Sequence, residues 1–470
     1  MKSLPNTMVD INKLEKEIYK YCCAMGCEML KTVLSKIDDE LMLERDRNVY
    51  RHKGKRQTTL KTIMGEVEYE RVLYEVKDEN NRINRIFLLE QELGFDTVGF
   101  ISDMLAEKIT EASCELSYRK TAQTVSELTG QSISHTGAWG VVQSIGEKLD
   151  KKERQDAICA KNNEGAGTEE TKLLFEEQDG VWLNLQGQDR KAHGSSKEMK
   201  IAIAYTGAKK TGKDRYNLTG KTACADFEGI NQFYARKEGV IADNYNVDEI
   251  DMRILNGDGA SWIKRSLVDD TVHYQLDIFH RNKAVLQYVA NSDARQNIFT
   301  LLYSKQIDLL LDVIEAYSNS TEDEKERENF LTLLKYFQNN KDGLVFYKRR
   351  NLDLPESPDG LEYRGCGAME SNVYTIIGHR MKHRRANWSI RGGNNLAKIL
   401  TLKATGKLSE ALSKLASIVL PEKYTEKIET VLSAAKSTEK VGKGWDGFTQ
   451  MTIPPSYKWM KDLFALKPIC

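Results

Sequence analysis

The feature that most restricts the fold of this chain is a change of pattern near residue 171, where helical periodicity gives way to apolar, strand-like runs. Three successive antiparallel strands are predicted there, at 171–187, 197–210 and 216–227. The next two apolar segments, 252–267 and 271–289, are each predicted to form a strand followed by a helix. Three meander strands followed by strand–helix repeats predict a mixed sheet flanked by helices.

The rest of the chain, before and after this sheet in the sequence, contains further helical and strand-like segments. Residues 10–41 carry apolar side chains at steps of three and four, which predicts one long amphipathic helix with Asp10 as its N-cap. A basic segment, which includes residues 51–61, leads into a predicted hairpin over 58–76. Residues 291–342 have a helical pattern, and a clean helix start is predicted at Ser320 or Thr321.

These patterns predict a multidomain protein of the α+β and α/β classes. The polar, glycine-bearing stretch 150–170 predicts a domain boundary, and a long helix-friendly run follows residue 368. We expect an N-terminal helix with a β-hairpin, a helical region, the first part of the sheet domain, an all-α insertion, the second part of the sheet domain and a helical C-terminus. Their predicted bounds are 1–95, 96–150, 165–290, 291–365, 366–410 and 411–470.

Charge balance and residue usage exclude several classes of protein. The 470 residues contain 69 Lys and Arg against 69 Asp and Glu, so bulk positive charge cannot hold this chain to nucleic acid, and any such surface must be a local patch. No stretch approaches 18 consecutive apolar residues, and the N-terminus lacks the apolar core of a secretory signal. Eight scattered cysteines without a CxxC pair argue against a zinc ribbon. We therefore expect a cytoplasmic protein with no membrane partner.

Residues 116–149 predict two helices joined by a short turn. The first is expected to end at about Leu128, with Gly130 as its C-cap, and Ser132 or Ser134 is the expected N-cap of the second. Such a glycine-containing turn between two helices is the outline of a helix-turn-helix. An ordinary helical hairpin has the same outline, so both interpretations remain open.

The second of these helices has an apolar side and a polar start. Its apolar side chains, including Trp139, are expected to point inward. In the helix-turn-helix interpretation, Ser134, His135 and Thr136 lie at its start, where they reach DNA.

Three acidic residues occupy positions typical of ligand binding. Asp179 lies in the middle of an apolar strand, and Asp258 lies at the end of another, between two glycines that leave room for a ligand. Glu370 lies at the start of a helical run. Two aspartates and a glutamate are the oxygen ligands that a two-metal phosphoryl-transfer site with Mg²⁺ or Mn²⁺ requires. Solvated or helix-capping carboxylates would give the same pattern.

A basic run without any acid follows Glu370, in GHRMKHRRANWSIRGG (378–393). We interpret it as a surface that binds DNA phosphates beside the carboxylates, with a tryptophan able to stack on bases. The alternative is a solvated helix face. The residues concerned are Arg380, Lys382, Arg384, Arg385, Trp388 and Arg391.

The order of several blocks resembles a known family. QDGVWLNLQG, NGDGASWIK, LDIFHRNKAV and GAMESNVYTIIGHRMKHRRANWS resemble, in order, the blocks of bacterial insertion-sequence transposases of the ISLre type. These resemble members of the wider Mutator-like group of DDE transposases. The likeness covers nearly the whole chain, including TTLKTIMGEVEYERVLY and LSYRKTAQTVSELTGQSIS.

The resemblance implies an RNase H-like catalytic core with a DDE triad. By motif match, Asp179, Asp258 and Glu370 would be the triad, and the group's helical insertion before the glutamate corresponds to residues 291–365. The group also carries an aspartate or cysteine shortly before a histidine, thought to help hold DNA near the active site. Asp277 and His280, in LDIFH, match this pair, whereas a packed histidine at a helix start is the alternative.

Rival acids exist for each member of the triad. Asp226 and Asp277 are alternatives for the aspartates. Glu356 and Glu362 are alternatives for the glutamate, although neither precedes a basic run.

The sequence thus predicts a metal-dependent DNA transposase that cleaves strands at element ends and transfers them to target DNA. Its expected partners are double-stranded DNA, both the element's terminal inverted repeats and the target, and further copies of itself in a homodimer or larger homo-oligomer. End recognition is assigned to residues 1–150. A non-catalytic DNA-binding regulator derived from a transposase remains the alternative, and a carboxylate-pair glycosidase is a more distant one.

Overall fold

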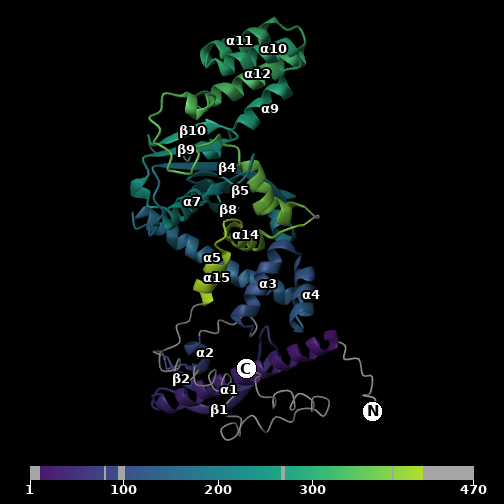
Figure 1. Cartoon of the computed structure of the whole chain (residues 1–470), viewed down its shortest axis with the longest axis vertical. Coiled ribbons are helices and arrows are strands. Elements are labelled where there is room, and N and C mark those ends of the chain that lie inside the picture. Colours follow the sequence, from purple (N-terminus) through teal and green to yellow (C-terminus); the bar gives the residue numbers. More distant parts are fainter. Residues whose placement is uncertain (1–10, 79–80, 94–100, 266–269, 384–385, 417–470) are drawn as a thin grey trace, which may run out of the picture. The chain divides into compact units, whose positions relative to one another are not determined.

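The structure, a computed structural model, describes residues 11–78, 81–93, 101–265, 270–383 and 386–416 (Figure 1). Two compact units can be distinguished, and each is described by itself. Unit 1 falls within Met1–Phe100, and unit 2 falls within Ile101–Ser417. Among the described residues, no helix is long and apolar enough to cross a membrane.

Unit 1 is a long helix packed on a small antiparallel sheet. Helix α1 buries Leu34 and Ile37 against apolar side chains of the sheet, such as Tyr69. The predicted long helix and hairpin are confirmed, and a third strand that the sequence pattern did not predict follows the hairpin. Asp10, the predicted N-cap, lies outside the described residues. The elements are α1 (Ile11–Glu44), β1 (Arg51–Lys61), β2 (Glu66–Lys77), β3 (Ile83–Phe87) and α2 (Leu88–Glu92), with strand order β1-β2-β3.

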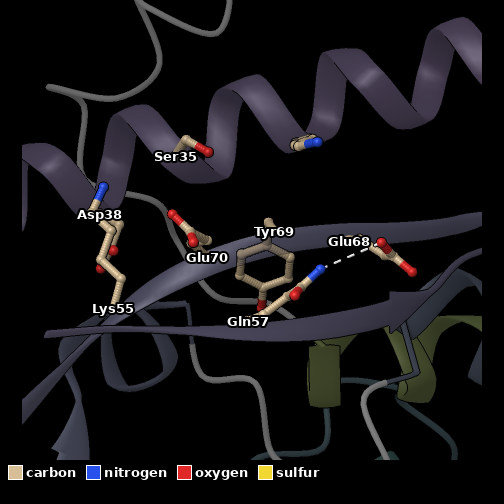
Figure 2. Close-up of a pocket in the computed structure, with 8 residues that line it drawn as sticks. Ser35, Asp38, Lys55, Gln57, Glu68, Tyr69 and Glu70 are labelled. Carbon is tan, nitrogen blue, oxygen red and sulfur yellow. Dashed lines mark hydrogen bonds between the residues drawn. The ribbon is translucent and has the colours of Figure 1, made fainter.

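A buried aspartate ties the helix to the sheet in unit 1. Asp38 is 1% exposed, and its Oδ2 accepts a hydrogen bond of 2.8 Å from the Val72 N–H, beside the shift in register of β1 between His52 and Lys55. Figure 2 shows Asp38 at the pocket between α1 and the hairpin, with Lys55 nearby on β1. Burial raises the pKa of Asp38, while the Val72 N–H lowers it. We assign Asp38 a structural role.

Unit 2 is built on a five-stranded mixed sheet. The strand order is β10-β9-β4-β5-β8, and only β5 runs opposite to the other four. Each of the five predicted segments contains one strand of this sheet, but 197–210 and 216–227 are each divided into two strands, one of which belongs to a separate hairpin. The strands are β4 (Leu173–Asn184), β5 (Ser196–Tyr205), β8 (Thr222–Asp226), β9 (Met252–Gly257) and β10 (Val272–Leu276), and a separate hairpin is formed by β6 (Gly207–Lys210) and β7 (Tyr216–Thr219).

Helices cover both faces of this sheet. Helices α5 and α14 pack on one face, around Phe175 and Ile201 of the central strands. Helices α7 and α9 pack on the other face, around Leu255 of β9, and this core continues into α10, α11 and α12. The α-helices of unit 2 are α3 (Asp103–Glu115), α4 (Tyr118–Thr129), α5 (His135–Lys161), α6 (Gly187–His193), α7 (Ile230–Asn244), α8 (Ser261–Lys264), α9 (Ile278–Tyr288), α10 (Ser292–Tyr303), α11 (Ile307–Ser320), α12 (Glu324–Asn339), α13 (Met369–Asn372), α14 (Ile390–Ala404) and α15 (Leu408–Ala416).

Short helices of other types complete the unit. The 3₁₀ helices are Val247–Glu249, Lys341–Gly343 and Tyr347–Arg349, and a π-helix, η4, spans Val373–Lys382. The insertion 291–365 contains α10, α11 and α12, as predicted, followed by an irregular segment. The insertion contacts the sheet at several points. The Tyr336 hydroxyl of α12 donates a 2.7 Å hydrogen bond to the main-chain oxygen of Asp258, and the Gln275 side chain of β10 bonds to the main chain of Gly343 and Tyr347.

Three predicted boundaries differ from the structure. Helix α5 continues to Lys161, because its second half packs on α7, so the boundary expected within 150–170 falls partly inside a helix. Helix α12 begins after Asp323, whose carboxylate caps it, rather than at Ser320 or Thr321. The helical run after residue 368 is broken between η4 and α14, where the chain pairs with β4 through the bridge between Leu185 and Trp388.

Candidate active site

Three aspartates follow one another across adjacent parallel strands. The parallel pairing of β4 with β9 reaches Gln178 and Gly257, and that of β9 with β10 reaches the last residue of each strand. The next residues along the three strands are Asp179, Asp258 and Asp277. Because neighbouring parallel strands present equivalent positions side by side, the register places these three carboxylates next to one another.

Glu370 approaches the same place from a distant part of the sequence. It lies in α13, and it lines one pocket together with Asp179, Asp258, Asp277 and His280. The structure therefore brings together the three residues predicted as a triad and the predicted Asp–His pair. The glycines that flank Asp258 serve packing, because a Cβ at Gly257 would lie 2.8 Å from the Ile263 side chain and one at Gly259 would lie 2.8 Å from Asn340.

The two half-buried aspartates each keep an oxygen available. The Oδ1 of Asp179 accepts a 2.7 Å hydrogen bond from the Gly180 N–H, and the Oδ1 of Asp258 accepts one of 2.8 Å from the Ala260 N–H. The second oxygen of each carboxylate has no partner within the part of the chain that the structure describes. The pKa of Asp179 lies above its usual value. Burial and the negative charge of Asp258 raise it, and the hydrogen bond from the Gly180 N–H opposes them. A bound cation would relieve this repulsion.

Glu370 differs from the aspartates in its surroundings. Its side chain is exposed, and it forms neither a hydrogen bond nor an ion pair with any described residue. Across the described ranges, no three His, Cys, Asp or Glu side chains stand close enough together to hold a metal ion. The three carboxylates thus share a pocket and have the right chemistry for Mg²⁺ or Mn²⁺, but in this structure they do not stand close enough together to contact one ion.

Asp277 and His280 form a hydrogen-bonded pair at the start of α9. The Oδ1 of Asp277 accepts the His280 N–H at 3.0 Å and lies 3.2 Å from Nδ1 of the imidazole. The Asn256 amide donates to Oδ2 at 2.9 Å. Burial raises the pKa of Asp277, but the hydrogen bonds from His280 and Asn256 outweigh it and hold this pKa below its usual value. The hydrogen bond to Asp277 raises the pKa of His280.

We expect NMR titration of the His280 ring to give a pKa above the ordinary histidine value, and Asp277→Asn to lower it, since the amide removes the negative charge that stabilises the imidazolium. A raised histidine pKa contributes stability that is fully present below the unfolded-state pKa and is lost as pH rises through the folded-state value. Wild type should therefore lose this contribution as pH rises above the ordinary histidine pKa. An identical His280 pKa in wild type and Asp277→Asn would contradict the pairing.

The sequence interpretation missed a buried carboxylate next to the site. Glu177 of β4 is fully buried, and its Oε1 accepts a 2.7 Å hydrogen bond from the Tyr205 hydroxyl. The backbone N–H groups of residues 367–369 donate to the same carboxylate at 2.9, 3.2 and 3.1 Å, and Asn256 donates to its Oε2 at 3.1 Å. Two adjacent acids inside the apolar strand LLFEEQDGVW were the available signal.

Glu176, the acid next to Glu177, makes its contacts on a different face of the sheet. Glu176 is 1% exposed and forms ion pairs of 2.5 Å with Lys237 and with Arg253. Arg253 also contacts the Glu238 carboxylate, through two hydrogen bonds of 2.9 and 3.0 Å. This cluster joins α7 to β4 and β9, and none of its members lines the pocket of Asp179.

The rival acids lie elsewhere. Asp226 is completely buried and forms an ion pair of 2.9 Å with Lys398, which is also completely buried, and it lies 3.5 Å from Arg236. Burial raises the pKa of Asp226, but these two cations lower it below its usual value. Glu356 and Glu362 are exposed in the irregular segment before Glu370, outside the pocket.

Two members of the predicted basic surface are in the interior, contrary to expectation. Arg380 is 8% exposed, donates a 2.8 Å hydrogen bond to the Ser113 carbonyl and lies over the rings of Tyr118 and Trp388. Trp388 is 7% exposed and donates to the Met381 carbonyl at 2.9 Å. Arg380 lies on the buried side of η4 and Trp388 follows the break after it, and both side chains are in the core, so neither can contact DNA from this position.

The remaining members of that run differ in their surroundings. Lys382 is exposed at the end of η4. Arg391 is exposed in α14 and forms an ion pair with Glu147 of α5. Arg384 and Arg385 lie outside the described residues.

The predicted helix pair is present as α4 and α5. Gly130 has φ +70° and ends α4, and the Ser134 hydroxyl caps α5 by accepting a 2.9 Å hydrogen bond from the Gly137 N–H. His135 and Thr136 are exposed in the first turn of α5. Trp139, expected to point inward, is 47% exposed, because the buried face of α5 runs through Ala138 and its helical neighbours instead.

Comparison with known proteins gives a family for the chain. The profile described as "Uncharacterised protein family (UPF0236)" matches residues 4–414. The chain belongs to this family. A UPF0236 protein in the vanSb 3′ region of Streptococcus gallolyticus is 23% identical over 419 residues, which cover 85% of this chain and 84% of the relative.

Other UPF0236 relatives come from Caldanaerobacter subterraneus subsp. tengcongensis. The protein TTE2489 is 23% identical over 410 residues, covering 86% of this chain and 80% of its own length. Another, 22% identical over 405 residues, covers 85% and 79% and has a name that joins eleven loci, from TTE0033 to TTE2212. Among solved structures, the Drosophila P element transposase strand transfer complex aligns with 71% of this UPF0236 chain and 87% of its own, at 12% identity and a TM-score of 0.23.

Proposed function

We propose that this UPF0236 protein is a DNA transposase that cleaves strands at the ends of its element and transfers them to target DNA. The observation that carries the proposal is the meeting of Asp179, Asp258 and Glu370, from three distant parts of the sequence, in one pocket at the end of parallel strands. Pairs and triples of carboxylates at such a position are the ligand set of metal-dependent phosphoryl transfer.

The architecture of unit 2 supports an RNase H-like core. Its five-stranded mixed sheet has helices on both faces, and a helical insertion separates the strands that carry the two aspartates from the helix that carries the glutamate. This is the arrangement that the resemblance to Mutator-like DDE transposases implies. The site also lies at the carboxyl ends of β9 and β10, where ligands of α/β sheets usually bind.

Each residue of the pocket can take a separate role in the reaction. Asp179 and Asp258 would hold Mg²⁺ or Mn²⁺ through their free oxygens, and Glu370 would complete the ligand set when its side chain turns inward. Such ions supply charge stabilisation for the attacking and leaving oxygens of a phosphodiester. His280, favoured in its charged form by Asp277, would attract a DNA phosphate at the rim.

DNA contact is assigned to exposed basic and polar side chains. Lys382 and Arg391 remain candidates for phosphate contact, as do Arg384 and Arg385. For reading the element ends, we retain the exposed start of α5 with His135 and Thr136, together with strand β1, which exposes Arg51, Lys55 and Arg56. Pairing of two ends requires at least a homodimer.

The names of the relatives add independent support. One relative's name joins eleven loci of a single organism. Repetition of one protein across a genome is what an element that moves and multiplies would produce.

One observation favours a second candidate, a DNA-binding regulator without catalysis. Within the described part of the chain, no three metal-ligating side chains converge. A protein that had lost catalysis but kept its DNA-binding surfaces would need no such convergence.

The decisive experiment incubates the full-length protein with a duplex containing the DNA that flanks its gene. We expect nicking at the element ends in Mg²⁺ or Mn²⁺ and complete loss of nicking when EDTA removes the metal. A scrambled duplex is the control for specificity. Specific binding without any cleavage would favour the regulator, and cleavage that persists in EDTA would contradict the assigned chemistry.

A further inference from the structure

We propose that Glu177 is the positioning residue of this site. Its one buried carboxylate holds the segment that carries Glu370, and it also holds the Asn256 amide, which fixes Asp277. The inference rests on the proposed function, because it concerns how the same pocket is kept in shape. Glu177 itself does not line the pocket, so it would act only through its neighbours.

Glu177 connects the two segments that must converge. Its Oε2 accepts hydrogen bonds from the backbone of residues 367 and 369, and its Oε1 accepts one from residue 368. Met369 directly precedes Glu370, so the carboxylate fixes the backbone from which the Glu370 side chain must reach the aspartates. The segment before α13 is also held by the Tyr347 hydroxyl, which donates to the Arg364 carbonyl at 2.7 Å, and by the buried Met369 side chain. Glu177 is the anchor that bonds directly to the main chain beside Glu370.

The second connection runs through an amide. The Asn256 side chain donates to Glu177 at 3.1 Å and to Asp277 at 2.9 Å, and so bridges the two carboxylates. Asp277 in turn holds the backbone and ring of His280. A change at Glu177 therefore reaches both sides of the pocket, although the residue is fully buried.

An acid at this position satisfies several hydrogen-bond donors at once, which an apolar side chain could not do. The partners of Glu177 are all neutral hydrogen-bond donors, and no cation among the described residues pairs with it. A buried carboxylate without a cation is unfavourable, and an apolar side chain would satisfy packing alone. Only an acceptor with two oxygens can serve five donors at once, whereas a glutamine would turn an N–H₂ group towards some of them.

The test compares full-length wild type with Glu177→Gln and Glu177→Asp. Glutamine keeps the size and removes the second acceptor oxygen, and aspartate keeps the charge but is one methylene shorter, which guards against a failure of the first variant to fold. Glu176→Gln is the matched control, because it alters an equally buried acid of the same strand whose partners, Lys237 and Arg253, lie outside the pocket.

Two measurements are made on each protein without DNA. Hydrogen exchange of a peptide covering residues 366–372 reports whether Glu177 holds the segment, and we expect exchange at least about tenfold faster in both Glu177 variants. Binding of Mn²⁺, followed by the EPR signal of the free ion, reports the ligand set. We expect affinity to fall by about 10- to 100-fold in the Glu177 variants and to remain unchanged in Glu176→Gln.

The outcomes separate this inference from the proposed function. Unchanged exchange at 366–372, or Mn²⁺ affinity equal to wild type in both Glu177 variants, would overturn the positioning role. An equal loss of affinity in Glu176→Gln would also overturn it, since general destabilisation would then explain the effect. If wild type itself binds no Mn²⁺, the metal-dependent function fails, while faster exchange would still support Glu177 as the anchor of the segment.

Discussion

Asp179→Asn, Asp258→Asn and Glu370→Gln are each expected to reduce strand cleavage by roughly a thousandfold or more, while DNA binding stays close to wild type. Each change keeps the shape of the side chain and removes one negative charge from the shared pocket. Because oxygen ligands with negative charge hold the divalent cation, the loss of any one of them disrupts the whole set. Nicking of a duplex with element ends gives the rate, and a gel shift gives the affinity.

Glu362→Gln is the matched control for this series. Glu362 lies shortly before Glu370 in the sequence but is exposed and outside the pocket. The Glu362→Gln protein should cleave DNA at the wild-type rate. A triad variant that does the same would remove its residue from the catalytic set, and a Glu362 variant that fails to cleave would transfer the role of the glutamate.

The second large effect is on stability. Asp226→Ala should lower the free energy of unfolding by about 3 kcal/mol, because it removes a fully buried carboxylate from the cluster of Lys398 and Arg236, which would keep only Glu153 as a shared partner. Urea denaturation followed by circular dichroism measures the change. The remaining folded protein should still cleave DNA, since Asp226 does not line the pocket.

Asp308→Ala provides the comparison for a surface ion pair. Asp308 pairs with Lys341 at 2.6 Å, but both side chains are well exposed, so removal should change stability by less than about 1 kcal/mol. A stable Asp226→Ala protein that no longer cleaves would instead make Asp226 a member of the catalytic set and revive it as the rival aspartate.

Local chemistry explains what the sequence could predict. Gly130 and Ser134 mark the ends of α4 and α5 because left-handed backbone and an N-cap hydroxyl act within a few residues. Asp179 and Asp258 could be predicted as site residues for a similar reason, because a carboxylate in or directly after an apolar strand needs a ligand or a partner. The strand register then brings the two side by side without any further information.

Long-range packing explains what the sequence could not predict. Arg380 and Trp388 belong to a basic run, yet both are buried, because Ser113 and Met381 offer carbonyl acceptors that no local pattern reveals. Glu177 was overlooked because its donors include Tyr205 and backbone groups almost two hundred positions away. The sequence shows that a buried acid needs partners, but it does not show which partners it finds.

The hydrogen bond from Tyr336 to the main chain of Asp258 makes the helical insertion part of the active site's support. An element of α12 thus braces the end of β9 at the residue proposed to carry out chemistry. An insertion that merely decorated a core could be lost or exchanged between relatives without consequence for catalysis. Because this hydrogen bond joins the helical bundle to the end of β9, a displacement of α12 would also displace the main chain of Asp258.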